Sequence, residues 1–237
     1  YERLGESDEI EKLQALHAKY YGGIAINRVG LELYSERALH WLNWTERELA
    51  NLREVLAWSL SENGDLQLGT EMVFALIWFW YRRGYFLEGL TWVEKLLEKP
   101  ELQAPSPLRA LALQSAGLLQ VWKGDQDQGL ARFEESLALF QRSEEERWIA
   151  PALMSNAVGL INMGRDQAAK PLLEQSQALF QKLGMDYFQA ITLVHLGNVA
   201  LGLGDPEAAL AALDKAESLA RSLNESWLIS FVMNNLG

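Results

Sequence analysis

Apolar residues recur along most of the chain at the spacing of an α-helix. In the stretch 187–203 they fall at Ile191, Val194, Leu196, Ala200 and Leu203. Such spacing places side chains on one face of a helix, whereas a half-buried strand alternates at every second residue. The sequence contains no run of β-branched residues with that alternation. The pattern therefore predicts an all-α protein.

The helical pattern repeats with a period of 40 residues. Glycines mark this period at Gly84, Gly124, Gly164 and Gly204. The blocks 133–140 and 173–180, one period apart, match almost residue for residue. A fixed period of this length indicates a stacked array, in which each unit packs only on its neighbours.

Each period is expected to hold two antiparallel helices joined by a short turn. Gly204 is placed to end one helix, where a residue with positive φ is wanted. Asp205 then caps the next helix, and Pro206 follows at its first position, where a missing N–H costs nothing. Pro171 lies inside another second helix, which it is expected to kink or to shift at its start.

Small residues at fixed phases let these helices pack closely, because helix axes approach only where side chains are short. They occur in the first helices at Gly117, Ala157, Gly197 and Gly237, and in the second helices at Gly129, Ala169, Ala209, Ser136, Ser176 and Ala216. The spacing Gly197, Ala209, Ala216 resembles the tetratricopeptide repeat. Large apolar partners stand at Leu193, Leu196 and Leu213.

The resemblance covers residues 66–237 and implies a right-handed α-solenoid of antiparallel helix pairs, with about four repeats and a truncated half-repeat. The chain departs from the family in its period of 40 rather than 34 residues. It also carries Ile77 and Leu96 at two positions of the first unit where small residues are expected. We therefore expect that unit to pack more loosely or at a different angle.

Residues 1–65 lack the glycine phase and are interpreted as an N-terminal helical segment that packs on the array of residues 66–237. Its first helix is expected to start near Leu4 or Ser7 and to be amphipathic through Tyr20. Thr45 and Glu48 have the spacing of a capping box, which predicts the start of a helix there.

Four motifs in this front part carry a narrower resemblance. They are the stretches 17–21, 41–42, 48–53 and 78–89, the last including Trp78-Phe79-Trp80 and Arg83-Gly84-Tyr85. Their order is similar to the helical segment that follows the NTPase and winged-helix modules in bacterial STAND-type signalling ATPases and transcriptional regulators. In that family the array senses a small-molecule or protein inducer and controls self-assembly of the whole protein. The resemblance implies that role here, in a cytoplasmic protein.

The amino-acid composition excludes several kinds of binding site and partner. The chain has 32 acidic and 21 basic side chains and a formal charge of -11, which argues against nucleic-acid binding by this chain. The absence of cysteine excludes disulfides, thiolate metal sites and a cysteine nucleophile. No apolar run reaches the length of a membrane span. Because the chain opens at Tyr1 and stops in mid-pattern at Gly237, we expect a fragment of a longer protein.

Motifs for catalysis or cofactor binding are missing. The sequence lacks both phosphate-binding patterns, G-x-x-x-x-G-K-[ST] and G-x-G-x-x-G. It also lacks the zinc-protease motif H-E-x-x-H and the serine-hydrolase motif G-x-S-x-G. Asp125 and Asp127 mimic the start of a calcium loop but lack its later ligands, so Asp125 is interpreted as a helix cap. His17, His40 and His195 are scattered. We therefore predict no enzyme activity, no cofactor and no metal site.

Tetratricopeptide arrays usually line their concave face with residues of the first helices. Applying the same positions of the 40-residue repeat to each first helix gives ten candidate ligand- or partner-binding residues. They are Phe74, Trp78, Tyr81, Gln114, Leu118, Met154, Val158, Val194, Asn198 and Asn234. The scarcity of Lys and Arg among them disfavours a clamp for a carboxylate terminus. Two other interpretations stay open: the same residues form core packing, or they form a surface for self-association.

The functional hypothesis is a non-enzymatic interaction and inducer-sensing module of a larger bacterial signalling ATPase or transcriptional regulator. It would bind a ligand or partner on the concave face and control assembly. The alternative is a plain tetratricopeptide scaffold that docks a peptide or protein without small-molecule sensing. Neither hypothesis involves a membrane or direct nucleic-acid binding by this segment.

Overall fold

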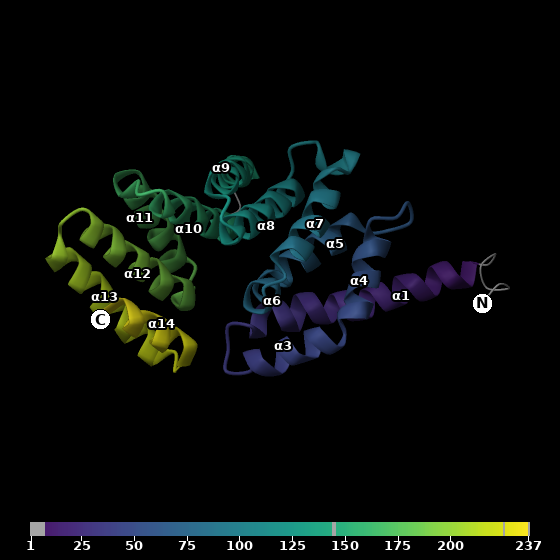
Figure 1. Cartoon of the computed structure of the whole chain (residues 1–237), viewed down its shortest axis with the longest axis horizontal. Coiled ribbons are helices and arrows are strands. Elements are labelled where there is room, and N and C mark those ends of the chain that lie inside the picture. The colour runs from purple at the N-terminus through teal and green to yellow at the C-terminus, as the bar shows by residue number, and fades with distance from the viewer. Residues whose placement is uncertain (1–7, 144–145, 225, 237) are drawn as a thin grey trace. The chain divides into compact units, whose positions relative to one another are not determined.

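The computed structural model describes residues 8–143, 146–224 and 226–236. Over these ranges the chain is helical apart from short turns, and no strand occurs in them, so the all-α prediction is confirmed (Figure 1). The helix start expected near Leu4 or Ser7 lies outside the described residues. Contacts divide the chain into two compact units, residues 1–123 and residues 124–237.

Unit 1 combines the front helices with the first helix pair of the array. Its elements are α1 (Asp8–Ile24), the π-helix η1 (Ala25–Val29), α2 (Gly30–Glu32), α3 (Ala38–Arg47), α4 (Leu49–Ser59), α5 (Leu66–Ala75), α6 (Ile77–Arg83), α7 (Phe86–Leu97), the 3₁₀-helix η2 (Pro100–Leu102) and α8 (Pro107–Lys123). Helix α1 packs on α4, and α5 packs on α4, α7 and α8. Phe79 and Trp80 are among the largest fully buried side chains.

Two polar links tie the front helices to the first pair of the array. Arg53 of α4 donates two hydrogen bonds of 2.7 Å to the carboxylate of Glu88 in α7. Arg83 at the end of α6 reaches Asn43 at 2.8 Å and Glu46 at 2.9 Å, both in α3. Exposed ion pairs add little stability, so their effect is mainly on orientation. The domain boundary after residue 65 remains a prediction, because both sides of it lie within unit 1.

The predicted capping box at Thr45 was wrong. Thr45 is fully buried inside α3, and its hydroxyl donates a 2.8 Å hydrogen bond to the carbonyl of Trp41. The next helix, α4, begins only at Leu49, with Glu48 at the N-cap and no side-chain capping bond. A threonine that bonds the carbonyl one turn earlier is satisfied within a helix, which removes its need to cap one.

The first helix of the first pair is interrupted. Helix α5 ends at Ala75 and α6 begins at Ile77, with Leu76 between them. Ile77 is buried and stands where later first helices carry Gly117, Ala157 or Gly197. A bulky side chain at this phase prevents the close helix contact that the small residues allow, and the break lies beside it.

Unit 2 is a regular series of helix pairs. Its helices are α9 (Gln126–Ser143), α10 (Glu146–Asn162), α11 (Asp166–Lys182), α12 (Asp186–Gly202), α13 (Pro206–Ser222) and α14 (Ser226–Leu236). Each packs on the next along the chain. The helices α10, α12 and α14 begin 40 residues apart, as do α11 and α13, so the predicted period is confirmed. Pro171 therefore lies within α11 without shifting its start.

The turns of unit 2 follow the predicted chemistry. Gly164 and Gly204 adopt φ values of 68° and 79°, which side chains other than glycine rarely tolerate. Gly184 closes a further turn with a φ of 66°. Asp205 accepts a 3.0 Å hydrogen bond from the backbone N–H of Ala208, so its capping role is confirmed.

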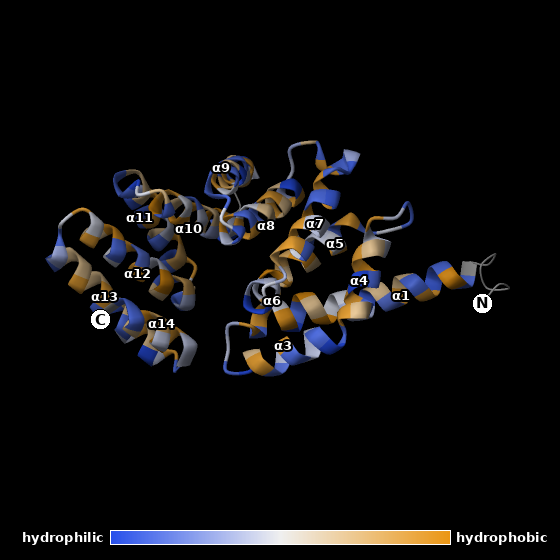
Figure 2. Cartoon of the chain, in the orientation of Figure 1, coloured by the Kyte–Doolittle hydropathy of each residue, from blue (hydrophilic) through white to orange (hydrophobic). Residues whose placement is uncertain are grey.

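Small residues bring the helices of unit 2 into close contact. A β-carbon added at Gly197 in α12 would lie 2.8 Å from the γ-carbon of Leu213 in α13. Ala169, Ala209 and Ala216 are fully or almost fully buried at the equivalent phases of the second helices. Most helices carry both hydrophobic and hydrophilic residues along their length, as expected when only one side faces the core (Figure 2).

Two buried polar side chains fasten neighbouring helices at these contacts. Asn156 in α10 donates hydrogen bonds to the carbonyls of Phe133 at 2.9 Å and Ala152 at 3.0 Å. Ser176 in α11 donates a 2.8 Å hydrogen bond to the carbonyl of Ala150. Because the partners are fixed backbone groups, these bonds favour one register of the helices over others.

His195 belongs to α12, and its ring centre lies 6.4 Å from that of Phe231 in α14. Removal of the imidazole from water lowers the pKa of His195 to about 4. The side chain is therefore neutral near neutral pH.

The first prediction concerns the contact at Gly197. Replacement Gly197→Ala should lower the free energy of unfolding by about 1 kcal/mol or more, because overpacking against Leu213 outweighs the better helix propensity of alanine. Gly23 in α1 is the matched control, since no atom lies within 4 Å of its added β-carbon. Gly23→Ala should leave stability unchanged or raise it by up to about 1 kcal/mol. Urea unfolding followed by circular dichroism measures both, and equal effects would contradict the close contact.

The second prediction concerns the pH dependence of stability. Because the folded pKa of His195 lies below the unfolded value, unfolded chains bind the proton first, and stability falls as pH decreases from about 6.5 towards 4. Thermal melts across this range should show a smaller fall for His195→Gln than for the wild type. The exposed His40→Gln variant should behave as the wild type, and identical pH profiles for all three proteins would refute the assignment.

Candidate functional site

The ten candidate residues differ in how accessible they are. Six are half-buried, namely Phe74, Trp78, Leu118, Met154, Val158 and Asn198. Tyr81 and Asn234 are exposed. Gln114 and Val194 lie in the interior, with 4% and 0% of their surface exposed. Their role in binding remains a prediction, and these last two would need rearrangement to touch a partner.

The candidates in unit 1 gather around the aromatic side chains of α6. Tyr81 packs against Trp122 of α8 with ring centres 4.5 Å apart. Trp78 lies 5.3 Å from Tyr81 and 5.6 Å from Trp122. Tyr81 still exposes 43% of its surface, so this cluster is partly open to solvent.

Two further residues complete this cluster. Tyr34, which follows α2, lies 5.5 Å from Trp78, and the indole N–H of Trp78 donates a hydrogen bond to its hydroxyl oxygen. Removal from water raises the pKa of Tyr34, while that hydrogen bond and the positive charge of Arg82 oppose the rise. Arg82 therefore lies close enough to the Tyr34 hydroxyl for its charge to act on it. We call Tyr34, Trp78, Tyr81, Arg82 and Trp122 the α6 aromatic surface.

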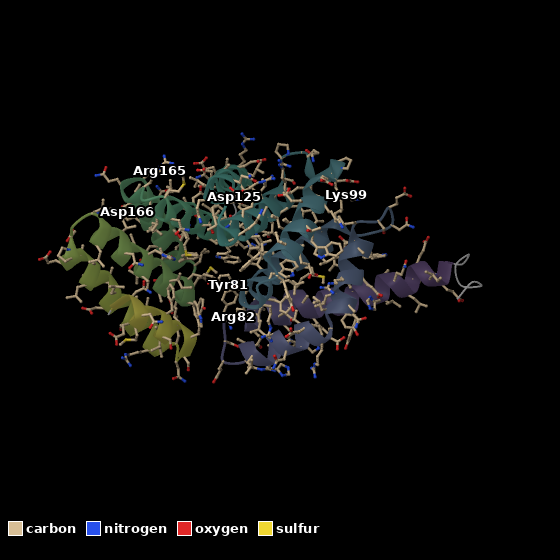
Figure 3. All side chains as sticks on the ribbon, viewed as in Figure 1. Tyr81, Arg82, Lys99, Asp125, Arg165 and Asp166 are labelled. Carbon is tan, nitrogen blue, oxygen red and sulfur yellow. The ribbon has the colours of Figure 1, made fainter. Side chains whose placement is uncertain are left out.

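Helical spacing explains why α6 presents these residues together. Trp78, Tyr81 and Arg82 stand at positions i, i+3 and i+4, which share one helix face. Figure 3 labels Tyr81 and Arg82, which come from the last turns of α6. The sequence analysis missed Arg82, although the spacing from Trp78 was available to find it. Tyr34 and Trp122 come from distant elements, and only the fold brings them to this helix.

The candidates in unit 2 have mixed surroundings. Met154 of α10 accepts a 3.4 Å hydrogen bond from the Thr192 hydroxyl of α12 and packs against two core clusters. Val194 belongs to the core between α12, α13 and α14. Asn198 donates a 3.0 Å hydrogen bond to Asn235 of α14, which links these two first helices. Only part of this predicted face is therefore accessible.

Two features absent from the described residues bear on other functions. Within 8–143, 146–224 and 226–236, no three histidine, aspartate or glutamate side chains are grouped to hold a metal ion. In the same ranges, no helix is long and apolar enough to span a lipid bilayer.

Part of the chain is similar in sequence to a known repeat and to known regulators. A sequence model of the tetratricopeptide repeat matches residues 148–222. Relatives described as HTH-type transcriptional regulators, from Mycobacterium tuberculosis and Mycobacterium bovis, are 28% identical to this chain over 177 residues. The alignment covers 72% of this chain and 19% of each relative. The chain thus spans about a fifth of the length of these regulators.

Solved structures share the fold at low sequence identity. The Rap protein complexed with Competence and Sporulation Factor has a TM-score of 0.72 and 14% identity, covering 95% of this chain and 61% of that protein. BtubC from P. vanneervenii has a TM-score of 0.65 and 19% identity, covering 91% and 90% of the two chains. Together with the 40-residue period, these similarities identify the chain as a tetratricopeptide-like helical array.

Proposed function

We propose that this chain is the partner-binding and inducer-sensing array of a larger bacterial transcriptional regulator or STAND-type signalling ATPase. Tetratricopeptide repeats are protein-interaction scaffolds, which gives the general function. The observation that carries the proposal is the accessible surface on the first helices, above all Trp78 and Tyr81 in α6. Aromatic side chains that stay partly exposed on a helix array are suited to contact a partner, which would cover them on binding.

The regulatory setting is supported by the relatives. They are described as HTH-type transcriptional regulators, and this chain corresponds to about a fifth of their length. The chain itself carries a formal charge of -11, which disfavours contact with phosphates. In this proposal another part of the protein binds DNA, and the array supplies the response to a signal.

Signal and response are coupled through differential binding. A ligand shifts an equilibrium only if it binds one state more tightly than the other. An inducer or partner that contacts the first helices in one arrangement of the assembled protein would favour that arrangement. A coupling of this kind typically changes a binding affinity by about 5- to 150-fold.

The third prediction tests this function in the full-length regulator. Deletion of the array, residues 66–237, should abolish the inducer response of a reporter gene while the protein remains expressed. The matched control is Leu210→Ala, because Leu210 is 57% exposed on the second helix α13, away from the first-helix surface. This control should keep the full response. An unchanged response after the deletion would refute the proposal.

Sensing and simple scaffolding are separated by thermal melts of the chain. A small-molecule inducer should raise the melting temperature in proportion to the logarithm of its concentration. If a metabolite panel leaves the melting temperature unchanged while a purified protein partner raises it, the chain is a scaffold without small-molecule sensing.

A further inference from the structure

The α6 aromatic surface contains a positive charge that the fold leaves uncompensated. In the part of the chain that the structure describes, the Arg82 side chain has no ion pair and no hydrogen bond. Its neighbour Arg83, in contrast, binds Asn43 and Glu46. Arg82 is half-buried, so part of its hydration is lost without a protein partner in return. Such a group is well placed to bind an anion.

The aromatic rings of this surface indicate which second chemical group the ligand carries besides its anion. Tyr81 and Trp122 pack 4.5 Å apart and Trp78 adjoins both, which forms a continuous aromatic surface. Flat or ring-shaped groups such as proline and aromatic side chains stack on surfaces of this kind. Arg82 lies one helical turn from Trp78, so one short ligand segment can reach both features.

We propose that this surface binds an acidic peptide segment in which a carboxylate lies next to a proline or an aromatic ring. This inference rests on the proposed function and specifies the partner. The carboxylate pairs with the Arg82 guanidinium, and the ring covers Tyr81 and Trp122. Local charge supports the acidic class, because Arg82 supplies a cation without an ion pair in the described residues, which a carboxylate can pair with.

The openness of the surface favours a peptide over a small molecule. Small-molecule sites enclose most of the ligand, commonly about 70–90% of its surface. Tyr81 instead remains 43% exposed, so a bound group would be covered on one side only. A peptide can compensate by extending along the helix and adding further contacts.

The fourth prediction is tested by selecting a phage-displayed random heptapeptide library on the 237-residue chain. Enriched peptides should carry Asp or Glu within two positions of Pro, Phe, Tyr or Trp. Fluorescence anisotropy with the most enriched synthetic peptide should then show binding at least about tenfold weaker for Arg82→Glu and for Tyr81→Ala.

The matched control is Arg142→Glu, which makes the same charge change at an exposed position of α9 in unit 2 and should bind as the wild type. Circular dichroism melts verify that each variant is folded. Enrichment of basic or purely apolar peptides, equal affinity for Arg82→Glu, or no enrichment would overturn the inference.

The outcome is separable from the test of the proposed function. If deletion of residues 66–237 abolishes induction but the selected peptides are not acidic, the inference fails and the proposed function stands. If acidic peptides bind through Arg82 while induction ignores the deletion, the surface is a docking site and the regulatory role fails.

Discussion

The array depends on one kind of contact, in which two helices approach closely because one of them carries a glycine or alanine at that point. Gly197 leaves room for Leu213, and the buried Ala169, Ala209 and Ala216 do the same at related positions. Because these small residues recur every 40 positions, each pair repeats the geometry of the one before it. Turn glycines, capping aspartates and buried hydrogen bonds then fix where each helix begins and how it is aligned.

The same constraint bears on where the aromatic candidates lie, which is in unit 1. In unit 2, the regular contacts draw Val194 into the core and leave Met154 and Val158 half-covered. In unit 1, Ile77 replaces the small residue, the first helix is interrupted, and bulky aromatic side chains fill the space. Tyr81 and Trp78 remain partly exposed there, so the irregular unit presents an aromatic surface, whereas the accessible candidates of unit 2 are aliphatic or polar.

The sequence was sufficient to predict features encoded by local or periodic patterns. The 40-residue period, the positive φ at Gly204 and the cap at Asp205 each depend on a few neighbouring residues. Features decided by distant contacts were not predictable in this way. Thr45 had the right spacing for a cap, but it is fully buried within α3 and its hydroxyl bonds the carbonyl of Trp41. Tyr34 and Trp122 meet Trp78 only after folding, although Arg82 could have been assigned by helical spacing.

The short sequence separation of the contacts in unit 2 has a consequence for folding kinetics. Side-chain hydrogen bonds that join its helices, such as those of Asn156, Ser176 and Asn198, link residues 23, 26 and 37 positions apart. Chains dominated by such local contacts lose little entropy in closing each loop and fold rapidly. Folding can start at any helix pair and spread to its neighbours, and a terminal pair can open without unfolding the rest.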